Sequence, residues 1–306
     1  MRKMIGPFLL AALACLGVAE PAPVGAADAK IVLIAGKPSH GPGAHEFNAG
    51  TKLLVKCLKE MPGIDPVLVT GGWPQDENVF EGARSVVFFM DGGKNHPMIQ
   101  GDRLETMRRL MDAGVGLVCL HYAVEVPAGK PGDAFLDWLG GYYETGYSTN
   151  PHWKAEIKTL PDHPITRGVH PFAIEDEWYY NIRFRPEMKG ITPIVVAKPD
   201  DATRKGKSSS PPGPYPHVVA ASGRDEVLAW AVERPDGGRG FGFTGAHFQK
   251  NWGNPDFRTL VLNAILWSAK LEVPSSGVQC TVSEEDLQKN LAPKPARKPA
   301  AKKAAD

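Results

Sequence analysis

The stretch Val115-Gly-Leu-Val-Cys-Leu-His-Tyr-Ala123 decides the fold of this chain. It follows the helix breaker Gly114 and contains an uninterrupted apolar run over 116–120. A run that is apolar on both faces and follows a helix-like segment is typical of a central strand in a parallel α/β sheet. Ligands of such sheets bind at the carboxyl ends of the strands. His121 comes directly after this strand, so the sequence places it at the ligand-binding edge.

The residues around His121 predict a sharp turn at the end of the strand. A turn that presents a reactive side chain there needs small residues two positions before and two after it, as in G-x-S-x-G. His121 has Cys119 and Ala123 at these positions, whereas Cys119 is flanked by the bulky Leu117 and His121. We therefore place His121 at the turn and Cys119 in the strand below it. The structural alternative is a strand-end histidine that only bonds a backbone carbonyl.

Strands and helices alternate on the amino-terminal side of this stretch. We expect buried strands over 30–35, 67–70 and 85–90, and helices over 46–60 and 100–113. This alternation predicts an α/β fold, a three-layer and mostly parallel sheet with right-handed crossovers.

The order changes on the carboxyl-terminal side, where strand-rich insertions are expected. We predict a short helix over 135–143, strands over 153–160 and 194–197, a hairpin of 227–233 with 240–245, and a last helix over 255–270. Residues 200–216 are rich in Lys, Ser, Pro and Gly, which favours a mobile surface loop.

The amino terminus has the composition of a signal peptide. Arg2 and Lys3 precede an apolar run over 4–18, and small residues follow up to Ala26. We therefore expect residues 1–26 to be cleaved and the mature protein to be periplasmic or secreted. The run is too short to span a membrane comfortably, so no membrane span is expected. Lipid attachment at Cys15 is the weaker alternative.

Charge and cysteine content exclude some classes of protein. The 306 residues carry a net charge of +1, which gives no reason to expect a nucleic acid partner. The expected mature chain keeps three of the four cysteines, Cys57, Cys119 and Cys280. Their wide spacing does not indicate a disulfide framework, and we expect Cys57 and Cys119 to act as small hydrophobic residues. The extension over 272–306 ends in a basic Lys, Ala and Pro tail, which is disordered by composition.

Polar side chains follow several of the predicted strands. His40 and His45 come after the first strand, Asp91 and His96 after the third, His121 after the fourth, and His247 after a strand near the carboxyl terminus. These strand ends converge on one edge of a parallel sheet. Histidines beside a carboxylate suit general acid–base chemistry or a divalent metal such as zinc. No HExxH-type motif is present, so a metal site rests only on this convergence.

Acidic and aromatic residues of the same loops point to the ligand. Carboxylate candidates are Asp91, Asp176 and Glu177, and aromatic side chains beside them suit stacking and hydrogen bonding to a polyhydroxylated ligand such as a sugar. Core packing is the structural alternative for each aromatic residue. The catalytic candidates are His40, His121, Glu177 and His247, and the substrate-binding candidates are Asp91, Tyr122, Asp176, Tyr179 and Trp252.

Several short motifs resemble those of the ThuA-like, trehalose-utilisation family. The matching pieces lie over 30–271 and comprise the 114–121 stretch, Asp162-His-Pro-Ile-Thr-Arg-Gly168, Asp176-Glu177 followed by Tyr179, Gly238-Arg-Gly240, Gly245-Ala-His247 and Asn254-Pro-Asp-Phe-Arg258. The resemblance implies a class I glutamine amidotransferase-like (flavodoxin-like) fold in which His121 takes the position of the usual nucleophilic cysteine. It also implies a link to sugar metabolism, including oxidised (keto) sugars.

Three functions are compatible with these observations. The first is an exported enzyme, a hydrolase, lyase or isomerase, that acts on a small carbohydrate through a His/Glu pocket with or without a metal. The second is a non-catalytic sugar-binding module that keeps the fold. The third is an amidase or peptidase that uses Cys119, against which the turn spacing argues. Contact between the pocket histidines and carboxylates separates the first two.

Overall fold

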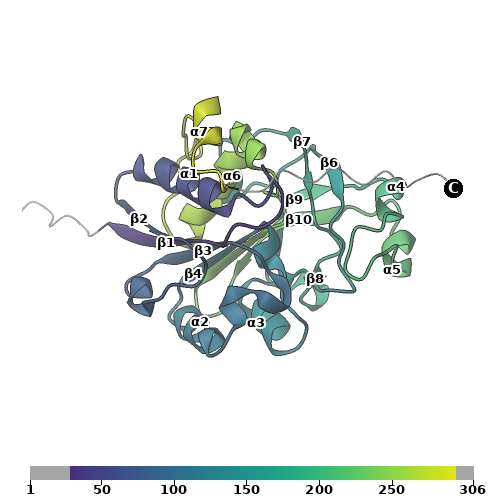
Figure 1. Ribbon diagram of the computed structural model, residues 1–306, viewed down its shortest axis with the longest axis horizontal. Helices are drawn as coiled ribbons and strands as arrows, with labels where there is room; N and C mark the ends of the chain where they lie inside the picture. The colour runs from purple at the N-terminus through teal and green to yellow at the C-terminus, as the bar shows by residue number, and fades with distance from the viewer. Residues whose placement is uncertain (1–27, 294–306) are drawn as a thin grey trace, which may run out of the picture.

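The computed structural model describes residues 28–293 and is built on a sheet of seven strands (Figure 1). The strand order is β2-β1-β3-β4-β11-β10-β9. Neighbours from β2 to β11 are parallel, and β10 is antiparallel to both β11 and β9. The strands are β1 Ala29–Ala35, β2 Ile64–Val69, β3 Ser85–Phe89, β4 Gly116–Leu120, β9 Ile191–Ala197, β10 Glu226–Glu233 and β11 Arg239–Phe243. The predicted mostly parallel α/β sheet is confirmed.

Strand β4 is apolar at every position because both of its faces are covered. Val118 and Leu120 pack into one hydrophobic core, and Leu117 and Cys119 pack into the other. No face of the strand meets water, so the alternation of apolar and polar residues seen in half-exposed strands is absent.

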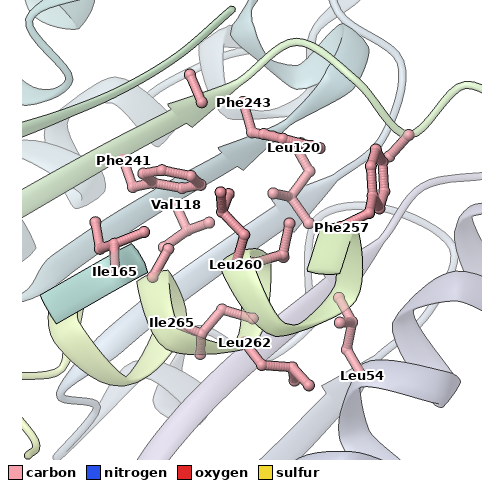
Figure 2. Packing of buried hydrophobic residues seen from close by; sticks show 14 of the residues in the cluster. Leu54, Val118, Leu120, Ile165, Phe241, Phe243, Phe257, Leu260, Leu262 and Ile265 are labelled. Atoms are coloured by element: carbon pink, nitrogen blue, oxygen red, sulfur yellow. The ribbon is translucent and has the colours of Figure 1, made fainter. Parts of the chain in front are cut away.

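Helices cover the sheet on both faces (Figure 1). Helices α1 and α6 contribute to the core of Val118, and α2 and α3 to the core of Leu117. Figure 2 shows Leu260 and Phe257 of α6 beside Val118, Leu120 and the phenylalanines of β11. The helices are α1 Phe47–Lys59, α2 Arg103–Asp112, α3 Lys130–Trp138, α4 Asp201–Arg204, α5 Pro216–Ala220, α6 Pro255–Ser268 and α7 Glu284–Gln288. No helix of residues 28–293 is long and apolar enough to cross a membrane.

The insertion between α3 and β9 forms two small antiparallel sheets. One pairs β5 (Gly141–Tyr142) with β8 (Arg183–Phe184), and the other pairs β6 (His152–Ile157) with β7 (Phe172–Glu177). Buried and exposed residues alternate strictly in β6, as expected for a strand with one solvent face. Strand β7 ends at Glu177, so the insertion brings the carboxylate of Glu177 to the carboxyl edge of the main sheet, beside His121 and His247.

Two predicted elements differ from the structure. The helix expected over 135–143 is α3, which ends at Trp138 because Gly140 adopts a φ of 83° and the chain continues as β5. The segment 200–216 contains α4, and its Arg204 is 2% exposed and pairs with Glu226 at 2.8 Å. This buried ion pair anchors a segment that its composition had suggested to be a mobile surface loop.

The extension after α6 is joined to α1 by a disulfide between Cys57 and Cys280. The expectation that Cys57 is an unpaired hydrophobic residue is therefore wrong. The two cysteines are 223 positions apart, so only the tertiary structure brings them together. Lys56 adds an ion pair with Asp286 at 2.8 Å. The expected signal peptide over 1–26 and the basic tail from residue 294 lie outside the described residues.

Candidate active site

The turn predicted at the end of β4 is present, and His121 occupies it. The φ of His121 is 54°, in the left-handed region that non-glycine residues rarely adopt. The chain then forms a short 3-10 helix, His121–Val124. A Cβ atom at Gly92 would clash with the carbonyl oxygens of Tyr122 and Glu125, so glycine lets the loop after β3 pack directly on this turn.

Three imidazole rings from separate loops meet at the carboxyl edge of the sheet. His45 Nε2 lies 3.0 Å from His121 Nε2 and 3.0 Å from His247 Nδ1, and the last two atoms are 3.2 Å apart. His45 follows β1, His121 follows β4 and His247 follows β11. The predicted convergence of strand-end histidines is observed here.

Glu177 completes this group from β7. Its Oε2 lies 2.9 Å from His247 Nδ1, 3.4 Å from His121 Nε2 and 3.4 Å from the Tyr179 hydroxyl. Asn150 donates to the other oxygen, Oε1, at 3.0 Å. Burial by itself would raise the pKa of Glu177, but the adjacent His121 and His247 rings lower it well below its usual range. Glu177 is therefore ionised at neutral pH.

The outer nitrogens of two rings define their tautomers. His121 Nδ1 lies 2.9 Å from the Thr244 carbonyl, which can only accept, so Nδ1 carries a proton and, in the neutral ring, Nε2 carries a lone pair. His45 Nδ1 lies 3.0 Å from Asp91 Oδ1, which assigns the same tautomer. Burial and the neighbouring His121 lower the pKa of His45 strongly, so its ring is neutral. Both Nε2 atoms thus present lone pairs to the centre of the cluster.

His40 lies beside the cluster and not in it. Its side chain is exposed, and its ring centroid is 3.6 Å from that of His45. Ser39 Oγ lies 3.0 Å from His40 Nδ1 and donates to Asp91 Oδ1 at 2.9 Å. Sequence reasoning chose His40 for the catalytic set, whereas His45, from the same loop, contacts His121. Asp91 orients His45 from behind.

Asp176 and Trp252 were expected to bind substrate, but the structure places both behind the site. Asp176 is 0% exposed, and its carboxylate accepts from the backbone N–H groups of Glu177, Ala246 and His247 at 2.7–2.9 Å. Trp252 is 0% exposed and packs against Phe89 and Phe257 in the core. Both predictions are corrected, because neither side chain reaches the cavity.

A cavity of about 210 Å³ opens above the cluster. Tyr122 and Tyr179, both candidates for substrate binding, line it, and the Tyr179 hydroxyl lies 3.2 Å from His121 Nε2. This volume is below the roughly 300–1,000 Å³ of drug-sized ligand sites, so it suits one small polar molecule. The remaining lining residues are His40, His45, Glu125, Tyr143, Asn150, Glu177, Ser209 and Ser210.

Several of these lining residues were missed by sequence reasoning. Ser209 and Ser210 belong to the segment interpreted as a surface loop, and Asn150 precedes β6. Only Glu125 had a usable signal, because it follows the turn of His121 by four residues. His96, which also follows β3, is fully buried and bonds the backbone of Ala123 and Met98, so it is a structural residue.

Cys119 lies in β4 beneath the turn, as the spacing predicts. It is unpaired and 0% exposed, and burial raises the pKa of its thiol far above the usual range. A reactive cysteine needs an accessible, stabilised thiolate. Cys119 therefore has none of the properties of a nucleophile.

Comparison with known proteins assigns the fold to a family. The ThuA family, described as trehalose utilisation, matches residues 32–268. The chain belongs to the ThuA family. The search of curated proteins gave no significant match.

Two solved structures of proteins described as ThuA-like share the fold. The one from Parabacteroides merdae ATCC 43184 is 18% identical, with a TM-score of 0.55 over 84% of this chain and 94% of that one. The one from Bacteroides uniformis ATCC 8492 is 14% identical, with a TM-score of 0.54 over 82% and 95%. These likenesses are consistent with the expected glutamine amidotransferase-like fold.

Proposed function

We propose that this ThuA protein is a metal-dependent enzyme that acts on a small carbohydrate. A divalent cation such as zinc would be held by His45, His121, His247 and Glu177, whose ligating atoms all lie within 4.8 Å of one another. The observation that carries the proposal is an excess of hydrogen-bond acceptors at the centre of this group.

The count of donors and acceptors shows this excess. The acceptors are the Nε2 lone pairs of His45 and His121 and Oε2 of Glu177, because Oε1 of Glu177 accepts from Asn150 instead. Two groups can donate to them, the Nδ1–H of His247 and the hydroxyl of Tyr179. The two lone pairs face each other at 3.0 Å, too close for a water molecule between them. A cation removes this repulsion.

The spacing and surroundings of the donor atoms also fit a metal. Ligands about 2.1 Å from zinc at right or tetrahedral angles lie roughly 3.0–3.4 Å apart, and the three imidazole nitrogens are 3.0–3.2 Å apart. Metal-ligating histidines usually donate their other N–H to a carbonyl or a carboxylate. His121 does so to Thr244 and His45 to Asp91.

The chain's own residues suggest how a sugar would be handled. When bound, the cation supplies a Lewis acid for a carbonyl or hydroxyl oxygen. The tyrosines of the cavity offer hydroxyl groups and ring faces to a sugar ring, and Asn150, Ser209 and Ser210 offer further polar groups. The family's link to trehalose utilisation supports a carbohydrate, and glycosides and keto-glycosides are the substrates we expect.

Metal binding tests this proposal directly. Protein stripped with a chelator and dialysed against zinc should retain about one equivalent by elemental analysis. His45→Ala and His121→Ala should lose it. His170→Ala is the matched control, because its side chain is 81% exposed and remote from the cluster, so it should retain zinc. Wild-type protein that binds no more zinc than His121→Ala would refute the metal site.

Catalysis is tested on the same samples. Zinc-loaded and zinc-free protein should be incubated with 4-nitrophenyl glycosides and their 3-keto derivatives, and turnover should require zinc. Zinc binding without turnover of any substrate would favour the non-catalytic sugar-binding module. Activity that survives His121→Ala but disappears on alkylation of Cys119 would favour the amidase alternative, which the burial of Cys119 does not support.

We also propose that the protein is exported. The order of charged, apolar and small residues over 1–26 supports cleavage near Ala26. The Cys57–Cys280 disulfide supports export as well, because disulfides persist in oxidising compartments. Amino-terminal sequencing of protein from the periplasm or medium tests it. An intact Met1, or a lipid on Cys15, would contradict it.

A further inference from the structure

Beyond the metal-ligand group, we infer that Glu125 is the general acid–base of the cavity. This inference rests on the proposed function, because it assigns the proton-transfer step of the same site. Glu125 lines the cavity with Glu177, yet it is not among the residues whose ligating atoms converge on a metal position.

The backbone holds Glu125 in a fixed position relative to His121. Both residues belong to the turn after β4, and the N–H of Glu125 donates to the Tyr122 carbonyl at 3.0 Å. The Glu125 carbonyl accepts from Gly93 N at 2.8 Å, and Glu125 forms a parallel bridge with Tyr143. Contacts on two sides thus fix the residue that carries the carboxyl group.

Within the described part of the chain, no Lys or Arg side chain forms an ion pair with the Glu125 carboxylate. Thr145 Oγ1 donates to Oε1 at 2.9 Å, and Oε2 accepts no hydrogen bond within residues 28–293. The titratable groups that face the Glu125 carboxyl group are Tyr122 on its own turn, Tyr143 after β5, Tyr179 and Glu177 from the insertion, and His121. Glu177 is the only carboxylate among these groups, and its negative charge opposes ionisation of Glu125. Oε2 is therefore available to a molecule in the cavity.

The two carboxyl groups of the cavity differ in protonation. Burial raises the pKa of Glu125 to about 7, the Thr145 hydrogen bond opposes this shift, and the charge of Glu177 adds to it. Glu177, in contrast, is kept ionised by the histidines. Carboxyl groups whose environments separate their pKa values in this way take different catalytic roles, one as acid–base and the other as a fixed charge.

The proton balance of the step is simple. In hydrolysis of a glycoside, protonated Glu125 gives its proton to the leaving sugar oxygen as the C–O bond to that oxygen breaks, and the carboxylate remains. The carboxylate then takes a proton from the water molecule whose oxygen forms the new C–O bond, so the protein ends unchanged. A group with a pKa near the working pH is best suited to both directions of transfer.

A titration tests the carboxyl group without any substrate. In metal-free protein labelled with ¹³C at glutamate carboxyls, one signal should titrate near pH 7 and be absent from Glu125→Gln. Thr145→Val removes a hydrogen bond to the ionised form, so that signal should shift to a higher midpoint. Glu156→Gln, whose side chain is 62% exposed on β6, should leave it unchanged. No glutamate midpoint above about 5 would overturn the inference.

Kinetics test the role and separate it from the proposed function. On a glycoside or 3-keto-glycoside that zinc-loaded wild type converts, Glu125→Gln should lower kcat by about 10²–10⁴-fold, with zinc stoichiometry unchanged. Thr145→Val should move the alkaline limb of the pH profile upward. Full activity of Glu125→Gln would overturn the inference alone. Loss of zinc from wild type, or no turnover of any substrate, would instead overturn the proposed function.

Discussion

Replacement of Asp176 tests how the site is positioned. Its buried carboxylate accepts four hydrogen bonds, from the backbone N–H groups of Glu177, Ala246 and His247 and from the Asn251 amide at 2.8 Å. Ala246 has a φ of 85°, a conformation that costs about 1–2 kcal/mol for a residue with a Cβ atom. The carboxylate holds this strained segment, and the segment places His247 in the cluster.

The expected magnitude follows from these contacts. Each buried donor left without a partner costs roughly 1–3 kcal/mol. If water reaches two of the four donors in Asp176→Ala, the other two cost about 4 kcal/mol in the free energy of unfolding. Asp176→Asn should be similarly unstable despite its equal size, because its NH₂ group would face N–H donors. Zinc affinity should fall about 10–100-fold, as for other groups that support a ligand.

Urea denaturation in EDTA and zinc competition with a chromogenic chelator measure the two effects separately. Asp225→Ala is the control, since Asp225 is 64% exposed and 3.7 Å from Lys198, and it should change stability by less than about 0.5 kcal/mol. If Asp176→Ala lost under about 1 kcal/mol and kept wild-type zinc affinity, other contacts would position His247 and the reasoning would be refuted.

Three further predictions concern stability and the thiols. Burial lowers the pKa of His96 to about 4 from an unfolded value near 6.5. The stability that its neutral ring contributes is therefore fully present above pH 6.5, and about 3 kcal/mol is lost as the pH falls to 4. In urea denaturation, the stability of His96→Gln should depend less steeply on pH over this range. The double variant Cys57→Ser/Cys280→Ser should lose about 3–5 kcal/mol in denaturant titrations, because it opens a loop of 223 residues, and an unchanged midpoint would contradict this. Native Cys119 should resist iodoacetamide by mass spectrometry and Cys119→Ala should keep its zinc, whereas rapid alkylation would show an accessible thiol.

The sequence predicted the parts of the structure that depend on local pattern. A run that is apolar at every position indicated a strand covered on both faces, and β4 spans the predicted residues 116–120. The small residues around His121 indicated the turn. The carboxyl ends of parallel strands share one edge, so the meeting of His121 and His247 followed from the order of elements alone.

Features that depend on the direction of a side chain, or on contacts distant in sequence, required the tertiary structure. His40 and His45 are both histidines of the same loop, so their residue type does not distinguish them. Only the path of that loop turns His45 towards His121. Asp176 and Glu177 are adjacent, and the pleat of β7 sends one behind the His247 segment and the other into the cavity.

The same reason applies to Glu125 and the disulfide. The pKa of Glu125 is set by the burial that surrounding elements impose, and no local pattern encodes it. Cys57 and Cys280 are paired because the carboxyl-terminal extension packs on α1. Local sequence determined which elements form and where they end, because periodicity and turn chemistry act over a few residues. The tertiary structure alone decided which groups are desolvated together, and that determines the charges and tautomers of the site.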